Sequence, residues 1–220
     1  MTIYGNFQNS IAAADKLLAM YVELRRSRGL GLRGALSAAN SDLLWLPRSA
    51  VVASLSALDA YIHSVVYERL PHALRLVPIP QPLCDAMSSI LPIKNAEGFR
   101  NAAPIIASAD SLAELSILLK EKTLVFVSYQ APEKIIAAYD LIGQANIFDR
   151  VSAIWPGPAT SADDIKRSLA SYVKRRNQIA HEGDLEHGGN ERPMQPIYAS
   201  GCKEFVVNLT SRLNRVVYGI

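Results

Sequence analysis

Apolar residues recur at steps of three and four along several stretches of the chain, which is the spacing of a helix with one buried face. Residues 7–26 carry one such stripe. A second, longer stripe begins after Pro47, where a helix can start, and ends near Pro71. It consists of Val51, Leu55, Leu58, Ile62 and Val65. Both stretches are predicted to be amphipathic helices.

The middle of the chain contains shorter apolar stretches between glycine and proline breaks. Helices are predicted around residues 85–91, 111–122 and 132–141. Residues 123–129 have a high β-propensity, but a lone strand has nothing to pair with, so a helix extension or an extended connector is expected. Residues 74–85 hold three closely spaced prolines and are predicted to be irregular.

Two further helices are predicted after the break at Pro156–Pro158. Ser161 and Asp164 resemble a capping box, from which a helix should run through His181. A final helix covers about residues 199–217. With helices throughout and no paired strands, the predicted fold class is all-α.

Composition adds limits to this picture. The 220 residues are half hydrophobic and one fifth charged, which is typical of a globular chain about the size of one domain. No repeat or linker divides it, so residues 1–220 are expected to form one domain, with about 83–158 as an inserted or elaborated helical region. A net charge of +3 is too small to indicate a nucleic-acid partner, so the placement of the charges must decide.

The cellular setting follows from what the sequence lacks. Cys84 and Cys202 lie far apart and outside any C-x-x-C pair, so a reducing compartment is expected. The first residues do not read as a signal peptide, and no apolar stretch was found that approaches the roughly 20 residues of a membrane span. The sequence therefore predicts a cytoplasmic protein without a membrane partner.

The predicted helix before His181 places an arginine among apolar residues. At about 100° per residue, Arg176 falls on the apolar stripe of this helix. The stripe consists of Ile165, Leu169, Tyr172 and Ile179. Because an unpaired charge is costly to bury, Arg176 is expected to have a carboxylate partner.

A second strip of the same helix is polar. Lys174, Asn177 and His181 align at steps of three and four, while His181 lies about 140° from Arg176. Histidine can transfer protons near neutral pH, and arginine can hold a phosphate whose charge grows in a transition state. RNA carries its own nucleophile, the 2′-hydroxyl. Positive charge on Lys166, Arg167 and Arg175 would suit its phosphate chain.

The segment RRNQIAH has the pattern Arg-Asn-x-x-x-His and resembles the signature of the HEPN superfamily of helical ribonucleases. With the following EGD it is most similar to the RiboL-PSP-HEPN type. The segment ALDAYIHSVV resembles the acidic helix of that type, and SYQAPEKIIAAYDLIG with IFDRVSAIW resembles its middle segment. The resemblance implies a HEPN-like helical bundle, with additional helices in the middle region.

The resemblance also implies roles for individual residues. Arg176 and His181 would be the catalytic pair, and Asn177 would take the polar position after the arginine. Asp59 would orient Arg176. Independently of the resemblance, the position of Lys174 on the polar strip suggests that it would help to steady the phosphorane. Two copies of the chain would form a homodimer in which both motifs line one cleft. The implied protein is an endoribonuclease of toxin, stress or anti-invader defence systems, with an antitoxin or RNA-repair partner as a candidate.

The chemistry of the residues defines the expected reaction. If His181 acts as general base on the 2′-hydroxyl while Arg176 holds the phosphate, no cofactor or metal ion is needed. The products would be a 2′,3′-cyclic phosphate and a 5′-hydroxyl. Nucleotide-binding and esterase motifs such as G-x-x-x-x-G-K-[ST] and G-x-S-x-G do not occur.

Three other interpretations remain open. His181, Asp184 and His187 form the pattern H-x2-D-x2-H, which metal ligands can adopt. The chain could be a non-catalytic HEPN module that binds RNA, a nucleotide or a protein partner. It could also be a plain helical dimerisation domain, in which the basic strip is a solvated face.

Overall fold

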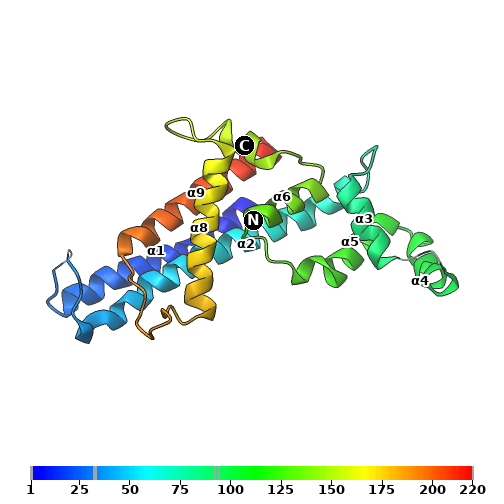
Figure 1. Cartoon of the computed structure of the whole chain (residues 1–220). Helices are drawn as coiled ribbons and strands as arrows, with labels where there is room; N and C mark the ends of the chain where they lie inside the picture. The colour runs from blue at the N-terminus through cyan, green and yellow to red at the C-terminus, as the bar shows by residue number, and fades with distance from the viewer. Residues whose placement is uncertain (1, 32–33, 92, 94, 220) are drawn as a thin grey trace. The chain divides into compact units, whose positions relative to one another are not determined.

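The computed structural model describes residues 2–31, 34–91, 93 and 95–219. Within these ranges the chain is all-α, as predicted, with no strand and one isolated β-bridge between Leu185 and Glu191. The helices (Figure 1) are α1 (Ile3–Ser27), α2 (Trp45–Ala73), α3 (Gln81–Ile90), α4 (Ala96–Ile106), α5 (Ser111–Lys122), α6 (Pro132–Leu141), α7 (Ile147–Ser152), α8 (Ala162–His181) and α9 (Pro196–Tyr218). Two 3₁₀ helices, η1 (Ala38–Leu44) and η2 (Leu124–Phe126), complete the set.

The chain divides into two compact units. The first comprises the residues up to Tyr61 together with those from Phe148 onward, and the second comprises Ile62–Ile147. Helix α2 contributes residues to both units. The prediction of one domain with an inserted or elaborated region at about 83–158 stays a prediction, and most of that region falls within the second unit.

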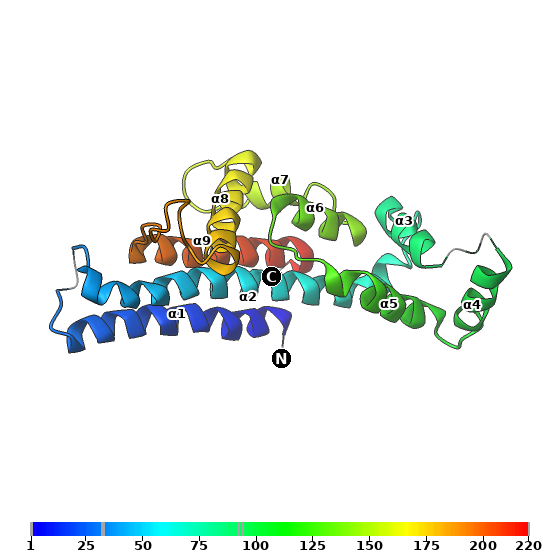
Figure 2. The ribbon, with the colours of Figure 1, turned by 60° about the horizontal axis from the view of Figure 1, so that its bottom comes forward.

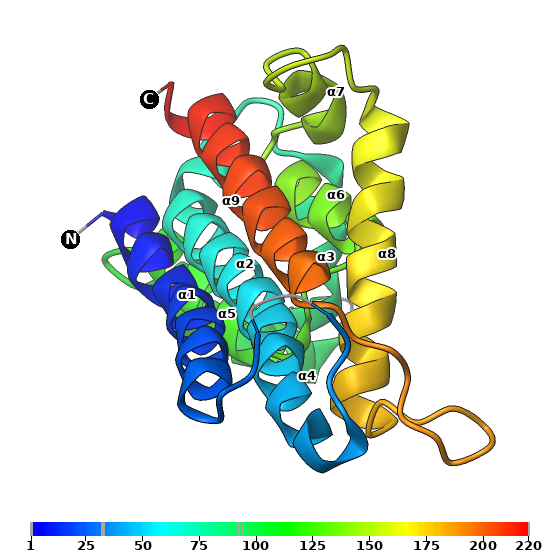
Figure 3. The same ribbon diagram turned by 90° about the vertical axis from the view of Figure 1, so that its left-hand side faces the viewer.

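In the first unit, α1, α9 and the first part of α2 run side by side (Figure 3). The aromatic rings of Phe7 in α1 and Tyr61 in α2 meet edge to face, with centroids 5.9 Å apart. The hydroxyl of Tyr61 donates to Oδ1 of Asn214 in α9 at 3.2 Å. An ion pair between Lys203 and Asp15 joins α9 to α1 at the surface. These contacts join the three helices that form the core of this unit.

Helix α8 packs on α9 through aromatic side chains. The ring of Tyr172 lies 5.3 Å from that of Tyr198 and 5.4 Å from that of Phe205. The capping box predicted at the start of α8 is present, since Ser161 and Asp164 satisfy each other's backbone N–H groups. The cap sets where the helix begins, and the aromatic contacts hold it against α9.

In the second unit, α5 contacts both α3 and α4, and α3 also contacts α6 (Figure 2). Its largest fully buried side chains include Leu83, Leu119, Ile135 and Tyr139. This unit therefore has a core of its own, built from the elaborated middle region of the chain.

Most helices predicted from the apolar pattern are confirmed. The bounds predicted for α5 and α6 match the structure, and all five residues of the α2 stripe are 0% exposed. The prediction that residues 74–85 are irregular is wrong at their end, because α3 begins at Gln81. Pro82 lies in its first turn, where a missing N–H costs little. Helices α4 and α7 were not predicted.

Among the residues that the structure describes, one helical stretch meets the length and composition criteria of a membrane span. It runs from Ala38 to Ala73, and its most apolar 18 residues have a mean hydropathy of 1.4. Of these 18 residues, 56% are buried inside the protein. The sequence reading that no stretch approaches such a span is therefore wrong by this criterion. A buried core helix meets the same criteria, and the α2 stripe is such a core face.

The two cysteines should differ in reactivity. Both are free, but Cys202 is fully buried and burial raises the pKa of its thiol to about 12. Since the thiolate is the reactive form, iodoacetamide at pH 8 should modify the half-buried Cys84 and spare Cys202. Peptide mass mapping of the native protein, with a denatured sample as the fully labelled control, measures this. Equal labelling of both thiols in the native protein would contradict the packing of α9.

Candidate functional site

Arg176, Asn177 and His181 meet in the last part of α8. Nη1 of Arg176 donates to Oδ1 of Asn177 at 3.0 Å and lies 3.4 Å from Nε2 of His181. His181 is the last residue of the helix and is exposed. The predicted catalytic pair and the polar residue beside it therefore form one contiguous surface group.

The contact between Arg176 and His181 was not evident from the helical wheel. The two residues are about 140° apart on an ideal helix. The arginine side chain is long enough to lie along the helix, with its Nε buried and its tip at the surface. Its guanidinium can therefore reach a residue that does not share its face.

The donor and acceptor roles follow from the chemistry of the two groups. A guanidinium has only donors, so a hydrogen bond between these two atoms requires Nε2 of His181 to be the acceptor. At 3.4 Å the bond is long and therefore weak, so an incoming phosphate can replace it.

The other predicted cations lie along the same helix. Lys174 is exposed. Lys166 pairs with Asp163 at 2.6 Å, and Arg167 pairs with Asp164. These pairs lower the pKa of both carboxyls, chiefly through hydrogen bonds from Lys166 to Asp163 and from Ser161 and Arg167 to Asp164. Exposed pairs of this kind are weak and exchange readily for phosphate contacts.

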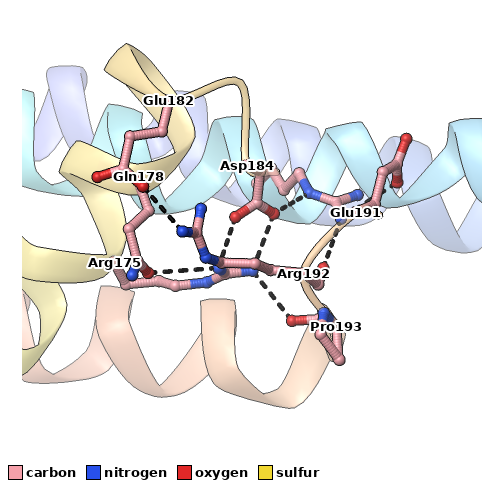
Figure 4. A network of polar contacts seen from close by, with 8 residues as sticks. Arg175, Gln178, Glu182, Asp184, Glu191, Arg192 and Pro193 are labelled. Atoms are coloured by element: carbon pink, nitrogen blue, oxygen red, sulfur yellow. Dashed lines mark hydrogen bonds and ion pairs between the residues drawn. The ribbon is translucent and has the colours of Figure 1, made fainter. Parts of the chain in front are cut away.

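Arg175 does not lie on this open surface. Its guanidinium grips the carboxylate of Asp184, with Nη2 2.9 Å from Oδ2, and also donates to the carbonyl oxygen of Pro193 at 3.0 Å (Figure 4). Its side chain is 13% exposed and that of Asp184 is 0% exposed. The predicted RNA contact of Arg175 stays untested, and the structure shows its guanidinium engaged in a largely buried ion pair.

Arg48 completes this network from α2. Its side chain is 1% exposed, and Nε donates to Oδ2 of Asp184. Nη2 of Arg48 reaches the carbonyl oxygen of Arg192 at 2.8 Å and the carboxylate of Glu191 at 3.3 Å. One buried carboxylate thus accepts from two arginines. Sequence reasoning missed Arg48, and no local pattern indicates it.

The loop after α8 closes over its own helix. Gly183 and Asp184 have φ of +63° and +57°, a conformation that glycine adopts freely and aspartate tolerates. The backbone N–H of Asp184 donates to the carbonyl oxygen of Gln178 at 2.9 Å. The pair Arg192–Glu182, at 2.9 Å, joins the far end of the loop to the residue after His181. We name the network of Arg48, Arg175, Asp184, Glu191 and Arg192 the Asp184 network.

The predicted ion pair between Arg176 and Asp59 is not formed among the described residues. Asp59 is half-buried on α2, whereas the hydrogen bonds of Arg176 go to Asn177 and His181. The sequence indicated a carboxylate partner for Arg176, but the arginine of α8 that has one is the neighbouring Arg175, which pairs with Asp184. The carboxylate comes from the turn after the helix, and the helical wheel does not extend to that turn.

The metal interpretation of His181, Asp184 and His187 is not supported. Both carboxylate oxygens of Asp184 accept from arginines, and the side chain is buried while both histidines are exposed. Within the described residues, no three His, Cys, Asp or Glu side chains gather into a group that could hold a metal ion.

Searches of protein-family models, curated proteins and solved structures found no match to this chain.

Proposed function

We propose that this protein is a metal-independent endoribonuclease of the HEPN type, with Arg176 and His181 as its catalytic pair. The contact between Nη1 of Arg176 and Nε2 of His181 carries the proposal. It joins a phosphate-binding group to a proton acceptor on an exposed surface. The resemblance of the segment RRNQIAH to the HEPN signature supports the same assignment.

In the proposed reaction, Nε2 of His181 takes the proton from the 2′-hydroxyl of the RNA. The 2′-oxygen then forms a bond to phosphorus, and the bond from phosphorus to the 5′-oxygen breaks. The imidazolium then gives this proton to the 5′-oxygen, which completes the 5′-hydroxyl and restores the neutral imidazole. Arg176 turns from His181 to the phosphate and stabilises the charge that grows on its oxygens.

The remaining predicted residues act in binding. Asn177 holds the tip of Arg176, and the exposed Lys174 lies one helical turn before Asn177. Lys166 and Arg167 extend the positive charge toward the start of α8. Arg175 is excluded from this role because its guanidinium belongs to the Asp184 network.

Cleavage should persist in excess EDTA, because Arg176 supplies the positive charge that a metal ion would otherwise provide. The fragments should end in a 2′,3′-cyclic phosphate and a 5′-hydroxyl. An RNA with a single 2′-deoxy position should resist cleavage at that position only. Gel mapping of the ends measures all three properties. Loss of cleavage with the chelator, or cleavage at the deoxy position, would overturn the mechanism.

We further propose a homodimer in which the two α8 motifs share one RNA-binding groove, since a symmetric pair doubles the positive field. Light scattering at micromolar concentration should give a mass of two chains. A monomer under these conditions would rule out a shared groove, although cleavage by one chain would remain testable. The proposed setting is cytoplasmic toxin, stress or defence action, restrained by an antitoxin or followed by an RNA-repair partner.

A non-catalytic HEPN module is the alternative function. It predicts RNA or protein binding without cleavage, and a mixed RNA pool incubated with the purified chain distinguishes the two. Intact RNA that remains bound to the protein would favour the module.

A further inference from the structure

The first unit contains a cavity of about 690 Å³ between the end of α1, the loop before η1 and the start of α9. Its volume falls in the range of roughly 300–1,000 Å³ that small-molecule sites occupy. The residues of the proposed catalytic surface do not line it. The cavity is therefore a separate feature of the molecule.

A buried arginine forms part of the cavity wall. Arg25 is 5% exposed and Tyr21 is 4% exposed, although both line the cavity. Nη1 of Arg25 donates to the hydroxyl of Tyr21 at 2.9 Å, and its guanidinium lies 5.7 Å from the centre of that ring. These contacts fix the direction of the guanidinium. The described lining contains this one cation and no acidic side chain.

The rest of the wall is mainly apolar. Leu36, Leu44, Met194 and Pro193 cover much of it, and Ile197 stands at the rim with 73% of its surface exposed. Few polar groups in an apolar wall are typical of sites that bind small organic molecules. Such a wall favours a ligand with an apolar body.

The N-terminus of α9 is a second source of positive potential at the cavity, besides Arg25. Its first residues Pro196 and Ile197 line the cavity, and its N-cap Gln195 makes no side-chain capping bond. The first turn of this 23-residue helix has no acidic side chain. The partial positive charge of a helix N-terminus favours an anion. A second hollow of about 220 Å³ shares Tyr21, Arg25 and Pro196 with the cavity, which gives an apolar chain further room.

We propose that this cavity binds an apolar small molecule that carries one carboxylate. The carboxylate lies against Arg25 and the N-terminus of α9, and the apolar body lies along Leu36, Leu44 and Met194. One guanidinium matches one negative charge, which favours a carboxylate over a phosphate monoester of charge about −1.5 to −2. The ligand would hold the loop at Pro193, whose carbonyl oxygen accepts from Arg175.

Decanoate tests the proposal on the whole chain, by titration calorimetry and by the shift in melting temperature. Wild type should bind decanoate and should bind neutral decanol more weakly, while acetate should give no shift. Arg25→Gln should weaken decanoate binding by about tenfold to a hundredfold, the worth of a hydrogen bond to a charged group. Arg26→Gln is the matched control, since this exposed neighbour is not among the residues that line the cavity and the variant should bind as wild type does.

A cavity-filling variant provides a second test of the site in case Arg25→Gln does not fold. Leu36→Trp retains Arg25 and should lose decanoate binding while its helicity stays that of wild type. No decanoate binding by wild type, or equal binding by Leu36→Trp, would overturn the site. Equal affinity for decanoate and decanol would overturn the anionic class of the ligand. None of these measurements depends on RNA cleavage.

Discussion

His181→Ala should abolish RNA cleavage and leave the melting temperature of the protein nearly unchanged. A positioned general base contributes about 10²- to 10⁴-fold to the rate, and the substitution removes the only group assigned to that role here. The side chain is exposed and takes part in a long, weak contact with Arg176, so its contribution to packing is small. Single-turnover cleavage of a labelled RNA, together with a thermal melt, measures both effects.

His187→Ala is the matched control, because His187 is an exposed histidine of the loop that follows the same helix. It should cleave at the wild-type rate. An equal loss of cleavage activity in both variants would indicate that the substitutions disturb the loop in general, or that both histidines bind the same metal ion. Wild-type activity of His181→Ala would refute the assignment of the general base.

Asp184→Ala should destabilise the protein by about 3–5 kcal/mol, the cost of breaking a buried ion pair from one side. The carboxylate is 0% exposed and accepts from two arginines, of which Arg48 is 1% exposed. Removal of the carboxylate takes the buried charged partner from both guanidinium groups, and Arg48 keeps only its longer contact with the more exposed Glu191. Urea unfolding followed by circular dichroism measures the change in the free energy of unfolding.

Asp42→Ala is the control for this prediction. Asp42 also grips an arginine through two bonds, to Arg28 at 2.8 Å each, but the pair is exposed. The unfolding midpoint of Asp42→Ala should stay near that of wild type, because water screens such a pair. Adding Arg48→Met to Asp184→Ala should recover part of the lost stability, since it removes a stranded charge. An unchanged midpoint for Asp184→Ala would show that the Asp184 network does not stabilise the fold.

The helices were largely accessible from the sequence, because their signals are local. A periodic apolar face and a cap lie within a few residues of each other, as Ser161 and Asp164 do at the start of α8. Helix α4 was missed because its short apolar pattern is interrupted by Gly98 and Pro104. Helix α7 has six residues, too few for a periodic pattern to be recognised.

The sequence alone determined that Arg176, Asn177 and His181 belong to one helix end, and these residue types led to the proposal of phosphate chemistry. The tertiary structure decided which arginine is buried. Arg48 and Asp184 are 136 residues apart in the chain, so no local spacing relates them, and only the packing of α2 beside the loop after α8 brings them together. In the folded chain, Asp184 accepts hydrogen bonds from Arg175, whereas Arg176 contacts His181. Burial is a property of the packed molecule, and a helical wheel describes one helix at a time.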